Sequence, residues 1–251
     1  MNMKNLKRFV LLILLLLTLV ILSSLFNHHR KLTIKFSNFY LLSENLYIDS
    51  AIERSKHSDI SILVQNAKQR IISKFGSFSS SPIIIIAGTS QRAKAYGTND
   101  FGSATAFPWD EYVVLGPKGY NIDVLAHELL HAELAYRLGY CLREFKLPIW
   151  LDEGIGMQVD YRKKYDIDIR LVNEKEIKRV KSINKRPIFN PNHFWSGGEK
   201  QVVLNYQISK ALVSGILNQD LNSSLYTMID KVKDGKAFED VFTINKTLHN
   251  R

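Results

Sequence analysis

The chain has 251 residues, of which 45% are hydrophobic and 23% charged, with a formal net charge of +10 and a single cysteine. This composition excludes a disordered chain, a collagen-like chain and a small disulfide-stapled domain. The length suits one globular domain with an additional segment. A charge of +10 raises the question of a nucleic-acid partner, and the distribution of the charge along the chain bears on the answer.

The basic residues are concentrated in two places. Residues 1–31 carry +5 with no acid, and residues 162–186 hold ten Lys or Arg against four Asp or Glu. Taking this +5 and +6 from +10 leaves −1 for the rest of the chain, which is not the pattern of a nucleic-acid-binding protein, so no nucleic-acid partner is expected. For 162–186 we expect a solvated helical surface, with contact to anionic lipid headgroups or acidic substrates as the alternative.

An uncharged apolar run occupies residues 9–26, FVLLILLLLTLVILSSLF. As an α-helix it would span about 27 Å, close to the hydrocarbon thickness of a bilayer. No small-x-small cleavage site follows it, which favours an uncleaved signal anchor over a cleaved signal peptide. We therefore expect a single-pass membrane protein, with 1–31 as the anchor and 32–251 as the domain. The flanking basic residues slightly favour placing the domain on the extracytoplasmic side.

Beyond the anchor, the apolar spacing predicts helices, a small group of strands, and then mainly helices. Residues 44–75 have the spacing of one or two amphipathic helices. The β-branched run 82–88 predicts a strand buried on both faces, and two further short strands are expected at 102–108 and 111–116. Helices are then predicted at 121–138, 150–162, 174–183, 201–217 and 223–232. The predicted class is α+β in one domain, and Cys141 is expected to be a small buried side chain.

One motif within these elements carries chemistry. His127-Glu128-Leu129-Leu130-His131 is H-E-x-x-H and falls inside the helix predicted at 121–138. Residues four apart lie on one face of a helix, so both imidazoles can reach one cation. Glu128 lies one residue further round, where it can contact a water on that cation. The motif leaves a third protein ligand to be supplied elsewhere.

A second block begins 17 residues after His131, with the sequence Pro148-Ile-Trp-Leu-Asp-Glu-Gly154. H-E-x-x-H followed by W-L-D-E-G resembles the gluzincin zinc metallopeptidases of the thermolysin and aminopeptidase type. The resemblance covers about residues 82–215 and is most specific in 127–131 and 148–161. It implies a zincin-like α+β domain that binds one zinc ion and hydrolyses peptide bonds.

The resemblance also implies roles for individual residues. His127, His131 and Glu153 would be the zinc ligands, and Glu128 the general base that takes a proton from the attacking water. Relatives also have an acidic residue that contacts a ligating histidine, because such a histidine donates its other N–H to a carboxylate. Asp160 and Asp152 are equal candidates for this residue.

Two further positions remain open from sequence alone. Tyr206 is the preferred donor to the oxyanion, with His193 as the alternative. The strand expected at Gly102–Phe107 would be an edge strand that pairs with an extended substrate.

Two departures from related patterns narrow the expected activity. The G-x-M-E-N strand of the aminopeptidases has no counterpart, because Gly102–Ala106 contains no acid. This favours an endopeptidase or a processing peptidase. The metzincin pattern is also absent, since Leu134 and Arg137 stand where its glycine and third histidine would be. The alternatives are an inactive zincin-like binding or scaffold protein, and a zinc hydrolase of non-peptide amides.

Overall fold

The computed structural model describes residues 29–183, 193–219 and 224–243, together with the single positions Leu6, Phe9, Leu15 and Thr18. Most of the apolar run at 9–26 therefore lies outside the described residues. Within the described part, no helix combines the length and apolarity that crossing a bilayer requires. The membrane anchor stays a prediction.

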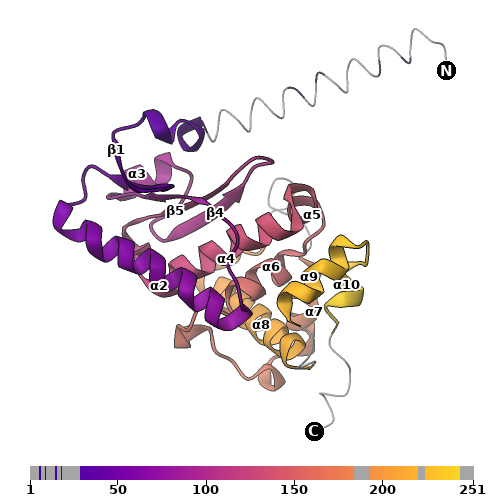
Figure 1. The fold of residues 1–251 in the computed structure, drawn as a ribbon. Coiled ribbons are helices and arrows are strands. Elements are labelled where there is room, and N and C mark those ends of the chain that lie inside the picture. Colours follow the sequence, from indigo (N-terminus) through magenta and orange to yellow (C-terminus); the bar gives the residue numbers. More distant parts are fainter. Residues whose placement is uncertain are drawn as a thin grey trace.

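A five-stranded mixed sheet forms one side of the domain, in the order β1-β2-β3-β5-β4 (Figure 1). Its strands are β1 (Phe39–Ser43), β2 (Leu46–Asp49), β3 (Ile83–Ile86), β4 (Gly102–Ala106) and β5 (Glu111–Leu115). The central strands β2, β3 and β5 are parallel, whereas β1 and β4 pair antiparallel at the two edges. The three strands predicted from sequence at 82–88, 102–108 and 111–116 are thus present.

Strand β3 is buried on both faces, as its β-branched composition predicts. Ile84 and Ile86 face the helical core, while Ile83 and Ile85 join a second apolar cluster on the opposite face of the sheet. All four side chains are buried. A strand buried on both faces needs no polar residues at alternate positions, which explains the run of four isoleucines.

Helices make up most of the remaining structure. The α-helices are α2 (His57–Phe75), α3 (Ser90–Ala95), α4 (Ile122–Leu138), α5 (Tyr140–Phe145), α6 (Ile149–Gly156), α7 (Glu174–Ser182), α8 (Gly198–Gln219), α9 (Leu225–Lys233) and α10 (Phe238–Val241). Short 3₁₀ turns lie at Ile34–Phe36, Arg54–Lys56, Pro117–Gly119, Lys163–Tyr165 and Ile169–Leu171. An α+β arrangement of a small sheet and mainly helical remainder therefore matches the expected class.

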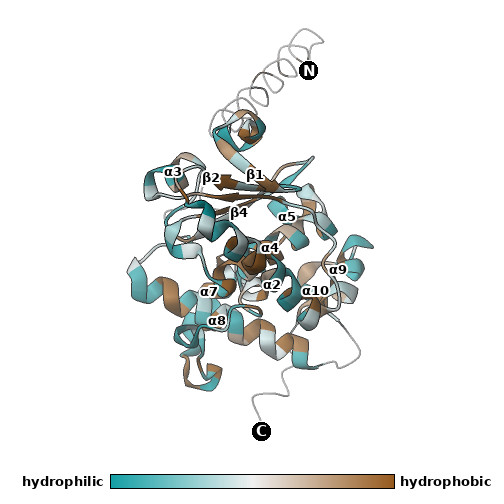
Figure 2. Cartoon of the chain, turned by 60° about the vertical axis from the view of Figure 1, so that its left-hand side comes forward, coloured by the Kyte–Doolittle hydropathy of each residue, from teal (hydrophilic) through white to brown (hydrophobic). Residues whose placement is uncertain are grey.

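Helix α4 is the centre of the domain. It contacts β4 and β5 of the sheet, packs along α2, and meets α6 on another side. Figure 2 shows this apolar helix enclosed between the strands and the outer helices. Most of its 17 residues are buried, which is the pattern of a helix covered all round rather than on one stripe.

The segment that follows the apolar run covers the outer face of the sheet. Residues 29–32 are helical, and Ile34 packs in the second apolar cluster with Phe39 and Tyr96. Lys31 is only 1% exposed, and its ammonium donates to Thr105 Oγ1 of β4 at 2.7 Å. This segment is therefore tied to the edge strand through a buried hydrogen bond.

Three expectations from sequence were wrong in detail. Residues 44–53 are not helical, because Asn45 adopts φ 63° in the turn of a hairpin and Leu46–Asp49 form a buried strand. The helix expected at 150–162 ends at Gly156. Cys141 is exposed on α5 rather than buried.

Burial of Lys31 makes stability depend on pH. Burial lowers the pKa of Lys31 from 10.5 to about 8, and the charge of Glu128 only partly opposes this. Between these two values the unfolded chain binds more protons than the folded one, so the free energy of unfolding rises with pH by up to about 3 kcal/mol. We expect Lys31→Met to lose this rise when denaturant unfolding is followed from pH 7.5 to 10.5. The exposed Lys35→Met is the control, and equal slopes for both variants would contradict the prediction.

Candidate metal centre

Helix α4 carries the H-E-x-x-H residues in the geometry that the sequence predicts. The helix begins cleanly because the side chain of Asn121 accepts a hydrogen bond from the Val124 N–H at 2.9 Å. His127 and His131 then project from the same face, and both are buried. Their rings lie with centroids 4.7 Å apart.

Helix α6 brings the third residue, Glu153, to the same point. It starts after Pro148, whose carbonyl accepts the N–H groups of Leu151 and Asp152. Two glycines then allow very close packing. A Cβ on Gly154 would lie 2.5 Å from the Ser209 carbonyl oxygen of α8, and one on Gly156 would lie 2.8 to 3.0 Å from the His127 ring.

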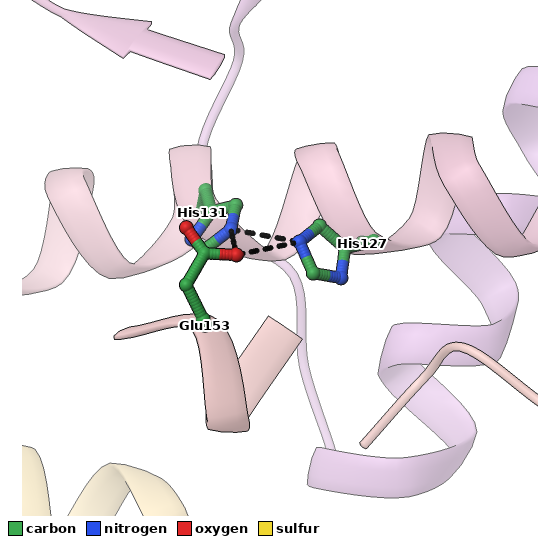
Figure 3. Close-up of side chains that lie close together, drawn as sticks. All are labelled: His127, His131 and Glu153. Atoms are coloured by element: carbon green, nitrogen blue, oxygen red, sulfur yellow. Dashed lines mark hydrogen bonds and ion pairs between the residues drawn. The ribbon is translucent and has the colours of Figure 1, made fainter. Parts of the chain in front are cut away.

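The three side chains present their ligand atoms to one small volume (Figure 3). The two Nε2 atoms of His127 and His131 are 3.0 Å apart. Glu153 Oε2 lies 3.3 Å from Nε2 of His127 and 3.6 Å from Nε2 of His131. A tetrahedral zinc ion with bonds of about 2.0–2.1 Å needs ligand atoms about 3.3 Å from one another. The arrangement therefore fits one zinc ion without any change of side-chain position.

Asp152 orients one of the ligands. Its Oδ1 lies 2.7 Å from Nδ1 of His131, on the ring atom opposite the ligand atom, and its Oδ2 lies 3.3 Å from Arg143. A carboxylate in this place selects the tautomer with a free lone pair on Nε2. Burial opposes a charge on His131, but Asp152 and then Glu153 outweigh it and raise the pKa of His131.

Asp160 does not take the orienting position. Helix α6 ends before it, so the two-turn spacing from Glu153 that motivated its candidacy is lost. Its carboxylate instead binds Arg162 through both oxygens. Burial opposes ionisation of Asp160, but Arg162 outweighs it and lowers the pKa. On the other histidine, Nδ1 of His127 is buried and has no hydrogen-bond partner in the structure.

Glu128 lies beside the ligands and below the edge strand. Burial raises the pKa of its carboxyl above the usual value, and this outweighs the opposing effects of His127, His131 and a hydrogen bond from the Ala104 backbone. Gly102 makes the approach of β4 possible, because a Cβ there would lie 3.1 Å from Glu128 Cγ. In the part of the chain that the structure describes, β4 pairs with β5 alone, so its outer edge has no neighbouring strand.

A cavity of about 500 Å³ opens onto these residues. His127 and Glu128 lie in its wall, together with Gly102 of β4 and Tyr206 of α8. The Tyr206 ring lies 6.2 Å from the His127 ring, measured between centroids. Burial and then the charge of Glu153 raise the pKa of the Tyr206 phenol well above its usual value. The phenol is therefore neutral and can donate a hydrogen bond.

His193, the alternative to Tyr206, does not line this cavity. Its Nδ1 accepts the backbone N–H of Trp195 at 3.2 Å, so it supports the loop beside the cavity. Of the two candidates for oxyanion donor, the structure brings only Tyr206 to the cavity wall.

Comparisons of the chain with protein-family models, with curated proteins and with solved structures found no match in any of the three. The case for a metal centre therefore depends on the chain's own residues and their arrangement.

Sequence reasoning missed three supporting residues. Arg143 lies on the short helix α5 and pairs with Asp152, Gly156 makes room for the His127 ring, and Trp195 lines the cavity. Gly156 could have been found from sequence, because a glycine within a predicted helix, three residues after the proposed ligand Glu153, indicates close packing. Arg143 and Trp195 are brought in by tertiary contacts and have no local pattern.

The basic segment 162–186 has a structural explanation in the part that is described. Arg162, Arg170, Lys178 and Arg179 each pair with an acid within four residues. On α7 the buried side chain is Val180, while Arg179 reaches the buried Asn205 of α8. Arg162 and Lys164 also line the cavity beside His127 and Glu128. The segment is therefore only partly a solvated surface, and contact with acidic substrates, the alternative from sequence, stays a prediction.

Gly156→Ala tests the packing that positions His127. The new Cβ would overlap the imidazole, so the ring must move away from Glu153. We expect zinc affinity to fall by roughly 10-fold or more, the scale seen when groups that orient metal ligands are changed. Competition with a chromophoric chelator measures this.

Gly215→Ala is the matched control for this substitution. Gly215 lies in α8, and a Cβ there meets no atom within 4 Å. We expect unchanged zinc affinity and a free energy of unfolding raised by up to about 1 kcal/mol. Equal zinc affinities for the two alanine variants would contradict the proposed role of Gly156.

Proposed function

We propose that this protein is a membrane-anchored, zinc-dependent metallopeptidase, acting as an endopeptidase or a processing peptidase. The observation that carries the proposal is the convergence of His127, His131 and Glu153 beside Glu128 on one cavity. Each of these side chains comes from the two sequence blocks that resemble gluzincins. A buried cluster of two imidazoles and a carboxylate is costly to keep without a cation, which further supports a metal at this point.

The ligands would hold one zinc ion, which supplies an acidified water and polarises the carbonyl of the scissile bond. Glu128 accepts the proton of the attacking water and passes it to the leaving amine. The raised pKa of its carboxyl suits this exchange, because a base with a pKa closer to neutrality can both take and return a proton. The hydrogen bond from the Ala104 N–H keeps the carboxylate in place.

Tyr206 would stabilise the oxyanion that forms at the carbonyl. The phenol is neutral, lines the same cavity as Glu128 and comes from α8, which packs tightly on α6. A positioned donor of this kind strengthens as negative charge develops on the oxygen.

The open edge of β4 supports a peptide over other amide substrates. An extended peptide could pair with the backbone groups of an edge strand that have no strand partner, and the side chains of Gly102, Ser103 and Ala104 are small. Such pairing would bring a backbone carbonyl of the peptide close to Glu128. A hydrolase of small non-peptide amides needs no such edge.

Glu128→Gln separates the proposal from an inactive scaffold. Removal of the base should reduce chelator-sensitive cleavage of a peptide library by about 10²–10⁴-fold, because general base catalysis is lost. Bound zinc should stay at one ion per chain, since the amide leaves the three ligands intact. The surface variant Glu174→Gln makes the same charge change away from the cavity and should keep full activity. Cleavage that survives in Glu128→Gln would exclude the proposed mechanism.

Tyr206→Phe tests the oxyanion donor separately. We expect kcat to fall by about 10²–10³-fold with little change in KM, because the lost hydrogen bond strengthens only in the transition state. A variant that lowers affinity for substrate while leaving kcat unchanged would show that Tyr206 only binds substrate.

The membrane topology has its own test. Protease added to intact cells should degrade the domain if residues 9–26 anchor it on the extracytoplasmic side, and lysis should not be required. A domain degraded only after lysis would overturn this orientation.

A further inference from the structure

The Tyr206 hydroxyl already has one hydrogen bond. The indole Nε1 of Trp195 lies 3.0 Å from the phenol oxygen. An indole N–H can only donate, so the oxygen of Tyr206 must be the acceptor in this contact. The phenol hydrogen is then left to bond with another group.

We propose that Trp195 is a positioning residue that directs the Tyr206 hydroxyl hydrogen toward the reacting carbonyl oxygen. This proposal rests on the proposed peptidase function. Trp195 and Tyr206 both line the cavity that contains His127 and Glu128. The indole N–H occupies one lone pair of the phenol oxygen, so the O–H cannot point toward the indole. It can point into the cavity, which Tyr206 lines.

The ring of Tyr206 cannot move away to release this contact. Phe194 packs edge-on against it at 5.1 Å and Tyr165 packs at 5.5 Å, measured between ring centroids. The His127 ring lies on a third side. The phenol oxygen is therefore held at a fixed place relative to a proposed zinc ligand.

The backbone of the loop that carries Trp195 is held by two hydrogen bonds, while Trp195 itself is 40% exposed. His193 accepts the backbone N–H of Trp195, and Asn205 Nδ2 donates to the carbonyl of Phe194 at 2.6 Å. Asn205 is fully buried, and its Oδ1 accepts a 2.6 Å hydrogen bond from Arg179 of α7. Asn205 therefore ties the loop that carries Trp195 to α7 and α8, which reduces the backbone entropy to be lost when the phenol is oriented.

The effect of this contact should appear in kcat. Trp195→Phe keeps a smaller aromatic ring in the cavity and removes the indole N–H, so the Tyr206 hydroxyl becomes free to rotate. We expect kcat to fall about 5- to 20-fold with KM changed less than 2-fold, a smaller loss than for Tyr206→Phe. Trp109→Phe, which alters an exposed tryptophan stacked on Phe107, should change neither constant.

A double-mutant cycle in the full chain, solubilised in detergent, tests the mechanism. In the Tyr206→Phe background, Trp195→Phe should have no further effect on kcat, because no hydroxyl remains to be oriented. If Trp195→Phe lowers kcat equally in both backgrounds, or in neither, the positioning role is wrong. Absence of any chelator-sensitive cleavage by the unaltered chain would instead overturn the peptidase function, and the positioning role with it.

Indole NMR provides a readout that is independent of turnover. The chain has three tryptophans, so ¹⁵N-labelled indole groups give at most three Nε1–H signals. Tyr206→Phe should move the Trp195 signal, identified by its loss in Trp195→Phe, and leave the other two in place. An unmoved Trp195 signal would show that the indole does not bond to Tyr206 and would overturn the proposal even if both variants lost activity.

Discussion

The close approach of α6 to its two neighbouring helices is the constraint on which the candidate centre depends. Gly154 lies against the α8 backbone, and Gly156 lies against the ring of His127. Side chains at either position would push α6 outward and carry Glu153 away from the two histidines. Because α4 is itself enclosed by the sheet, α2 and α6, it cannot shift to compensate. Packing at two glycines therefore sets the distances between the ligand atom of Glu153 on α6 and those of the two histidines on α4.

Charge balance is the second condition that this packing imposes. His131, Asp152, Glu153 and Arg143 are all buried, and isolated charges of this kind would cost several kcal/mol each. These groups form a chain of neighbouring pairs: Arg143 contacts Asp152, and Asp152 contacts His131. Beside them, Glu153 contacts His127. The two histidines outweigh burial and lower the pKa of the Glu153 carboxyl. Two histidines and a glutamate are a ligand set found in zinc sites.

The sheet and the helical layer meet at the cavity. Edge strand β4 is held from one face by Lys31 and lies against Glu128 on the other. Helices α7 and α8 hold the loop 193–196 and with it the contact between Trp195 and Tyr206. Glu128 and Tyr206 both line the cavity. The fold thus brings together on one cavity two residues that lie 78 positions apart in the sequence.

Local pattern determined the parts of this protein that depend on local spacing. The i, i+4 histidines and the helix around them follow from the 3.6-residue period, and strand β3 follows from its β-branched run between turn signals. The role of Glu153 as third ligand is implied by the resemblance of its block to gluzincins. Tertiary structure decided the rest. The hairpin at 39–49 has apolar spacing that also suits a helix, and only its pairing with β3 selects the strand. Asp152 rather than Asp160 reaches His131 because α6 ends at Gly156. Trp195, Lys31 and Arg143 have roles that arise from long-range contacts, which no local period encodes.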